Sequence, residues 1–168
     1  AASLDTNEAI NIQYTSGTTG FPKGATLSHR GILNDALLVG QSCAYTEEDR
    51  VCIPVPFYHC FGMVMGNLAC SIYGAAMVIP CPTFDPAAVL DTVEAERCTS
   101  LYGVPTMFVA EIGHESLAAK DFSEVILRSL LISSSVRIDL SIPSGKFYLP
   151  PPGFLFVGDL LLLWLLSI

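Results

Sequence analysis

Between Ala9 and about Leu131 the sequence alternates short apolar runs with longer amphipathic stretches, and no other feature limits the possible folds as strongly. The alternation is typical of an α/β fold with a mainly parallel sheet and flanking helices, because apolar runs form buried strands and amphipathic stretches form covering helices. The predicted strands cover residues 9–15, 25–29, 50–55, 75–80 and 99–105, and the predicted helices cover residues 29–41, 57–71, 86–96 and 105–113.

Several polar and proline residues mark where the predicted helices begin. Ser28 can cap the helix that follows it, and Asp85 can cap a helix with Pro86 at its first position, where a missing N–H is not needed. Pro105 opens another helix in the same way. The stretch Tyr45–Arg50, "YTEEDR", ends in four charged residues and therefore predicts a solvated loop.

The stretch "YTSGTTGFPKG", from Tyr14 to Gly24, lies between the first two predicted strands and is rich in glycine and hydroxyl residues. Glycines let the backbone approach a ligand closely, successive N–H groups can form an anion-binding nest, and Lys23 adds a positive charge. This combination suits a polyphosphate. It is not a Walker A loop, because Pro22 stands where the second glycine would be. By composition alone, a plain hairpin turn explains the stretch equally well.

Charge and cysteine spacing exclude some function classes. The 168 residues include 8 Lys+Arg and 16 Asp+Glu, a formal net charge of -8, so we expect no nucleic-acid partner. The six cysteines show no C-x-x-C pair and no zinc-ligand spacing. We therefore expect buried free thiols rather than disulfides or a metal site.

The complete string "YTSGTTGFPKG" resembles the phosphate-binding signature of the adenylate-forming (AMP-binding) superfamily, which includes acyl-CoA synthetases, firefly luciferases and adenylation domains of peptide synthetases. Together with "PFYHCFG" and "LYGVPTMF", it is similar to the medium-chain, mitochondrial acyl-CoA synthetase branch. The resemblance covers residues 7 to about 130 and implies part of the large N-terminal domain of an adenylate-forming enzyme.

The resemblance implies a two-step ligase reaction. A fatty acid carboxylate attacks the α-phosphate of ATP, and the thiol of CoA then displaces AMP, with Mg²⁺ and fixed donors stabilising the charge on the phosphates. Medium-chain fatty acid, ATP and CoA are therefore the expected small-molecule partners. The residues implied for the ATP phosphates are Thr15, Ser16, Gly17, Thr18, Thr19, Gly20 and Lys23.

Two further segments correspond to the substrate pocket of the family. His59 in "PFYHCFG" matches a position near the acyl group, although a packed histidine with one hydrogen bond explains the same residue. Gly103, Val104 and Pro105 follow a predicted strand, where open α/β sheets bind ligands, although a simple strand-to-helix turn is an equal alternative. No catalytic residue and no metal ligand is assigned.

The resemblance ends before the chain does. The adenine loop, the Tyr-Gly-x-Thr-Glu segment, the ribose aspartate and the C-terminal domain with its adenylation lysine are absent from this sequence. We therefore divide the chain into a partial AMP-binding domain over 1–132 and a divergent tail over 133–168. The apolar run Phe154–Leu166 is shorter than the roughly 20 residues of a spanning helix, so membrane association is possible but not expected.

These observations predict a fragment or truncated form of a medium-chain fatty acid–CoA ligase that is inactive in isolation. The alternative is a non-catalytic protein that binds phosphate or nucleotide, or that regulates a full-length relative. Mitochondrial location is implied by the resemblance only.

Overall fold

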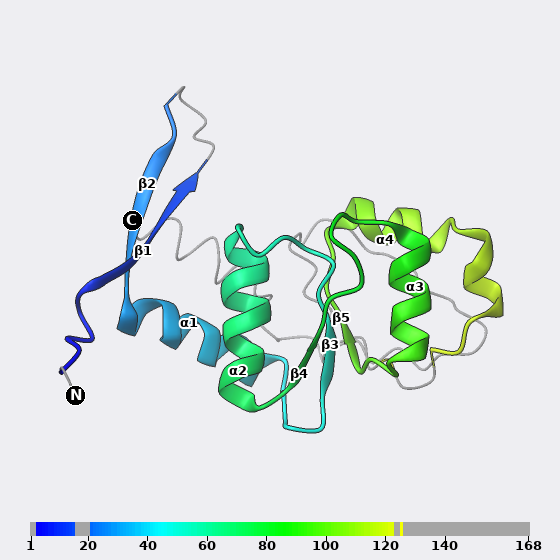
Figure 1. The fold of residues 1–168 in the computed structure, drawn as a ribbon, viewed down its shortest axis with the longest axis horizontal. Helices are drawn as coiled ribbons and strands as arrows, with labels where there is room; N and C mark the ends of the chain where they lie inside the picture. The colour runs from blue at the N-terminus through cyan, green and yellow to red at the C-terminus, as the bar shows by residue number, and fades with distance from the viewer. Residues whose placement is uncertain (1–2, 16–20, 123–124, 126–168) are drawn as a thin grey trace.

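The computed structural model describes residues 3–15, 21–122 and 125 (Figure 1). Within these described residues, five strands form two separate sheets, an antiparallel pair β1-β2 and a parallel sheet of order β4-β3-β5. The strands are β1 (Ala9–Thr15), β2 (Lys23–Ser28), β3 (Arg50–Cys52), β4 (Ala76–Val78) and β5 (Ser100–Leu101). The helices are α1 (His29–Ser42), the π-helix η1 (Phe61–Leu68), α2 (Ala69–Tyr73), α3 (Pro86–Ala95), α4 (Pro105–Ile112) and the 3₁₀ helix η2 (Glu115–Ala119).

The parallel sheet is covered by helices on both faces, as the sequence pattern predicts. Val51 pairs with Met77 of β4 and with Ser100 of β5, so β3 is the central strand. Because successive side chains of a strand point to opposite faces, Val51 packs with η1 and α2 whereas Cys52 packs with α3 and α4. The α/β fold class with a mainly parallel sheet is confirmed, and its two cores lie on either side of β3.

The hairpin β1-β2 extends away from the helix-covered sheet (Figure 1). Its antiparallel register pairs Ile12 with Thr26 and Tyr14 with Gly24. One face packs on the helices, where Leu27 joins a buried cluster with Ile32 of α1 and Val64 of η1. The hairpin is therefore anchored at its base, where β2 leads directly into α1.

The predicted helix starts after Ser28, at Pro86 and at Pro105 are confirmed. The Ser28 side chain accepts a hydrogen bond from the Gly31 N–H at 3.1 Å, and Asp85 accepts one from the Ala88 N–H at 3.1 Å. Pro86 and Pro105 occupy first-turn positions of α3 and α4. These starts depend on local contacts within a few residues, which is why the sequence alone predicts them.

Two parallel strands end earlier, and one helix begins later, than the sequence predicts. β3 ends at Cys52 and β5 at Leu101, shorter than the predicted 50–55 and 99–105. Pro54 limits β3 because it has no N–H to give to a sheet ladder. The predicted helix over 57–71 begins only at Phe61, so His59 lies in the segment before it.

The predicted solvated loop Tyr45–Arg50 is wrong for two of its residues, because Tyr45 and Asp49 are buried. The Asp49 carboxylate accepts hydrogen bonds from the Thr46 N–H at 2.8 Å and from the Thr99 hydroxyl at 2.7 Å. These donors replace water around the charge, so the loop packs against the start of β5 instead of extending into solvent.

The cysteines are free thiols, and all except Cys81 are buried. Among the described residues, none of the helices combines the length and apolar character that crossing a membrane requires.

Candidate functional site

The glycine-rich stretch closes the β1-β2 hairpin. Thr15, the last residue of β1, pairs with Lys23, the first residue of β2, so the two ends of the stretch lie directly across from each other. Ser16, Gly17, Thr18, Thr19 and Gly20 lie outside the described residues. The structure therefore brings Lys23 to the same end of the hairpin as Thr15, and Lys23 is exposed there.

His59 follows the central strand β3 at its carboxyl end. The Nδ1 of its side chain accepts a hydrogen bond from the Phe61 backbone N–H at 3.1 Å, and the His59 backbone N–H donates to the Pro56 carbonyl at 3.3 Å. Because Nδ1 is an acceptor, the neutral ring carries its proton on Nε2. The side chain is exposed, so this Nε2–H donor is available to a ligand at the surface of the segment.

Gly103, Val104 and Pro105 follow β5, the neighbour of β3, at the same end of the sheet. Gly103 is buried, and a Cβ there would lie 3.0 Å from the Phe108 ring. Val104 and Met107 pack against the same cluster as Phe57. The segments containing His59 and Gly103–Pro105 thus leave adjacent parallel strands, and apolar side chains from both pack on one core, as in a ligand site at strand ends.

Comparison with known proteins identifies the family. The sequence profile of the AMP-binding enzyme family matches residues 1–142. This chain belongs to the AMP-binding enzyme family.

Relatives of the chain include acyl-CoA ligases. It is 46% identical over 121 residues to the mitochondrial medium-chain acyl-CoA ligase ACSF2 of Danio rerio, covering 71% of this chain and 20% of the relative. YngI of Bacillus subtilis is 58% identical over 121 residues, covering 72% of this chain and 22% of YngI. The chain therefore spans about a fifth of the length of these relatives.

Solved structures of AMP-binding enzymes share the fold. ATP-bound MatB from Rhodopseudomonas palustris aligns with a TM-score of 0.61 and 33% identity, covering 67% of this chain and 22% of MatB. The anthranilate CoA ligase AuaEII in complex with anthranoyl-AMP aligns with a TM-score of 0.68 and 26% identity, covering 75% of this chain and 25% of that one. The described fold is therefore part of the N-terminal domain of an adenylate-forming enzyme.

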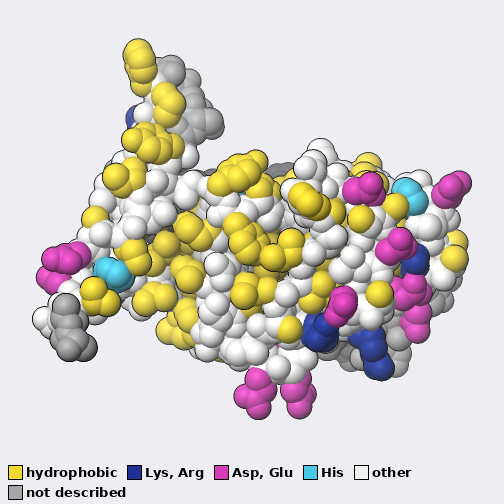
Figure 2. Space-filling view, viewed as in Figure 1, with side chains coloured by type: hydrophobic (Ala, Val, Ile, Leu, Met, Phe, Trp, Pro, Cys, Tyr) yellow, Lys and Arg dark blue, Asp and Glu magenta, His cyan; other side chains and the backbone are white. Residues whose placement is uncertain are grey.

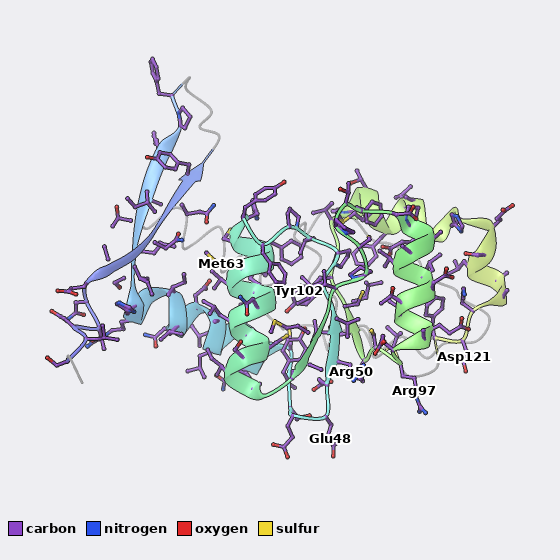
Figure 3. All side chains as sticks on the ribbon, in the orientation of Figure 1. Glu48, Arg50, Met63, Arg97, Tyr102 and Asp121 are labelled. Carbon is purple, nitrogen blue, oxygen red and sulfur yellow. The ribbon has the colours of Figure 1, made fainter. Side chains whose placement is uncertain are left out.

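A buried hydroxyl network in this AMP-binding family member connects the two strand-end segments. Tyr102, directly before Gly103, is 0% exposed, and its hydroxyl donates to the Met65 carbonyl of η1 at 2.8 Å (Figure 3). Its ring stacks on Phe61, with ring centroids 5.3 Å apart. Tyr102 therefore points into the core, and it fixes the chain that follows β5 to the helix that follows His59.

Tyr45 completes this network. Its hydroxyl donates to the Tyr102 hydroxyl at 3.0 Å and lies 3.0 Å from the Ser100 hydroxyl, which must then donate to Tyr45. Burial raises the pKa of both tyrosines well above the usual value, so both remain neutral donors. Sequence reasoning missed Tyr45, because its partners lie 55 and 57 positions away and only the fold brings them together.

Glu111 on α4 is the second ionisable group that sequence reasoning missed. It is 3% exposed, and its Oε1 has no hydrogen-bond partner in the described part of the chain. Burial raises the pKa of its carboxyl from 4.5 to about 8. Nothing in the described residues groups three or more His, Cys, Asp or Glu side chains into a metal site, so Glu111 is not assigned as a ligand.

Proposed function

We propose that the chain carries the ATP-phosphate loop and two acyl-contacting segments of an AMP-forming acyl-CoA ligase. The observation that carries the proposal is the hairpin register, which pairs Thr15 with Lys23 around the signature stretch. The names of the relatives, which include medium-chain acyl-CoA ligases, support the reaction class.

Lys23 and the loop residues would hold the β- and γ-phosphates of ATP. Backbone N–H groups and hydroxyls supply neutral donors, and the ammonium of Lys23 supplies the charge that a leaving pyrophosphate requires. The ATP in the MatB complex supports ATP as the nucleotide. Mg²⁺ would neutralise the phosphates further, but its protein ligands remain unassigned, and CoA is the proposed acceptor in the second step.

His59 and Gly103–Pro105 would bound the acyl chain. Both follow carboxyl ends of adjacent strands; His59 is exposed with an Nε2–H donor, and Phe57 and Val104 from the two segments pack on the same core cluster. A medium-chain fatty acid is the proposed substrate, by similarity to the ACSF2 ligases. Their names also support a mitochondrial location, although YngI is bacterial.

We further propose that residues 1–132 form the partial AMP-binding domain and that residues 133–168 are a divergent tail. The 168 residues include the phosphate-loop signature but not the adenine, ribose and lysine elements expected for adenylation. On its own, this stretch of chain would therefore bind phosphate or nucleotide without completing the reaction.

A chimera tests the ligase assignment. Residues 7–130 would replace the matching segment of Danio rerio ACSF2, which supplies the missing elements, and octanoate-dependent ATP–pyrophosphate exchange would be measured. We expect the chimera to catalyse exchange and Lys23→Ala to abolish it. A folded chimera without exchange would contradict the ligase assignment, and exchange that survives Lys23→Ala would contradict the role of Lys23.

His59→Ala in the same chimera tests the acyl segment. Exchange with butyrate, octanoate and laurate should show a changed order of preference, with the KM for ATP unaltered. A change in the KM for ATP with the same acyl preference would contradict the pocket role.

A further inference from the structure

The Met65 carbonyl of η1 does not receive the hydrogen bond that an α-helix would give it. In an α-helix, this carbonyl would accept from the Ala69 N–H, four residues later. Here the Ala69 N–H donates to the carbonyls of Val64 and Gly66 instead. The bond to Val64 spans five residues, as in a π-helix, so it passes over Met65 where η1 continues into α2.

The Tyr102 hydroxyl takes the place of that donor. It donates to the Met65 carbonyl at 2.8 Å, across 37 positions of the chain (Figure 3). Both residues are 0% exposed, so water has no access to this carbonyl. Because a buried carbonyl without a donor is costly, the hydroxyl removes a penalty that the π register would otherwise carry.

Two further contacts hold Tyr102 against η1. The Tyr45 hydroxyl donates to the Tyr102 oxygen at 3.0 Å, which leaves the Tyr102 proton for Met65. The Tyr102 ring stacks on Phe61, the first residue of η1, with an interplanar angle of 18°. Tyr102 therefore contacts both the first residue of η1 and the carbonyl that its π register passes over.

The first residues of η1 orient the His59 ring. The Phe61 N–H donates to His59 Nδ1 at 3.1 Å, and Cys60 Sγ lies 3.7 Å from the same nitrogen. His59 is exposed, and its neighbour Tyr58 is 84% exposed. Figure 2 shows hydrophobic side chains at the surface where the helix that continues into α2 begins. Within the described part of the chain, contacts with the start of η1 thus orient this ring.

A return of η1 to the α register would move the start of the helix. The turn would lose one residue, which displaces the residues before Met65 by roughly 1.5 Å along the axis and about 100° around it. Phe61 could then not keep both its stack on Tyr102 and its bond to His59.

We propose that Tyr102 is a positioning residue, whose hydroxyl holds η1 in the π register and thereby orients His59. The consequence for substrate binding rests on the proposed acyl-contacting role of His59. The orientation of the ring does not, because it follows from contacts within the described residues.

The tautomer of His59 provides the test, because it is measured in the full chain without enzymatic turnover. The nitrogen-15 shifts of His59 Nδ1 and Nε2 would be recorded at about pH 8.5, where imidazole is neutral, with His59→Ala to assign the signals. We expect a single Nε2–H tautomer in the unaltered chain. Tyr102→Phe keeps the ring and removes the hydroxyl, so both shifts should move toward the average of mixed tautomers.

Tyr73→Phe is the matched control, because the Tyr73 hydroxyl also donates to a helix carbonyl, that of Leu37, at 2.9 Å. It should leave the His59 shifts unchanged, and circular dichroism checks that each variant is folded. Unchanged His59 shifts in Tyr102→Phe, or equal changes in the control, would overturn the proposal.

Tyr45→Phe is a milder variant for the case in which Tyr102→Phe does not fold. It removes the donor to the Tyr102 oxygen, so it should move the same His59 shifts in the same direction by a smaller amount. Unchanged shifts in this variant would then overturn the proposal.

The consequence for substrate binding is tested in the chimera with Danio rerio ACSF2. Tyr102→Phe should raise the KM for octanoate and leave the KM for ATP unaltered, and equal changes in both would overturn the positioning role. An unaltered chimera without exchange would contradict the ligase assignment alone, because the tautomer is measured without turnover.

Discussion

Glu111 is a carboxyl group that the fold buries without a partner for Oε1 among the described residues. Burial raises the pKa of its carboxyl from 4.5 to about 8 in the folded chain. Between pH 4.5 and pH 8 the folded state therefore keeps a proton that the unfolded state has lost. Because the unfolded state then holds fewer protons, stability falls as pH rises from about 4.5 to about 8.

Glu111→Gln should remove this pH dependence. We expect the free energy of unfolding of the unaltered chain to fall by roughly 3–6 kcal/mol relative to the variant across that interval, since each pKa unit corresponds to about 1.4 kcal/mol. Urea unfolding at several pH values measures the difference. Parallel pH profiles for the two proteins would show that the carboxyl is hydrated or paired in the folded chain.

The burial of polar residues such as Glu111, Tyr45 and Asp49 could not be predicted from the sequence. Tyr45 and Asp49 are buried with hydrogen-bond partners 55 and 50 positions away, and Glu111 is buried although a carboxyl group alone predicts exposure. Ser28 and Asp85 were predictable, because a capping side chain bonds to a backbone N–H three positions later. His59 stands between these cases. The sequence predicts a pocket role for it, which stays a prediction, and only the structure shows that its Nδ1 accepts a hydrogen bond from the Phe61 N–H.

The π-helix η1 depends on a close approach between Gly62 and the segment that follows β3. A Cβ at Gly62 would lie 2.5 Å from the Pro56 carbonyl oxygen and 2.8 Å from its carbon, which are backbone atoms that cannot rotate away. Because Gly62 has no side chain, η1 can pack directly against the backbone of Pro56, in the segment that leads to His59. Further along η1, the Met65 carbonyl accepts from Tyr102. π-Helical turns are rare in proteins, and they are frequently found at functional sites.

Gly62→Ala should destabilise the fold by about 1–3 kcal/mol, because the added methyl group forces a backbone shift. Gly31→Ala in α1 is the control. Its Cβ would lie 3.3 Å from Ser28 Oγ, and alanine favours a helix over glycine by about 1 kcal/mol, so little loss is expected. Chemical denaturation measures both. Equal destabilisation by the two substitutions would contradict the close approach at Gly62.

The arrangement of the elements was predictable in part. The alternation of apolar and amphipathic runs predicted the α/β class, because period and length are local properties. The sequence did not reveal that β3 is the central strand, since strand order depends on contacts between segments about 25 and 50 residues apart. It also identified the signature stretch as a loop between strands, and the register now pairs Thr15 with Lys23 at its ends.

Titration of the full chain with Mg²⁺–ATP is the most direct test of the proposed ATP-phosphate site at the hairpin. We expect binding that Lys23→Ala weakens about tenfold or more, because a hydrogen bond to a charged group contributes about 1.5–3 kcal/mol. Arg30→Ala removes the same charge from the exposed first turn of α1 and should leave affinity within about twofold. An absence of binding by the unaltered chain, or equal losses in both variants, would contradict the assignment of the loop to the ATP phosphates.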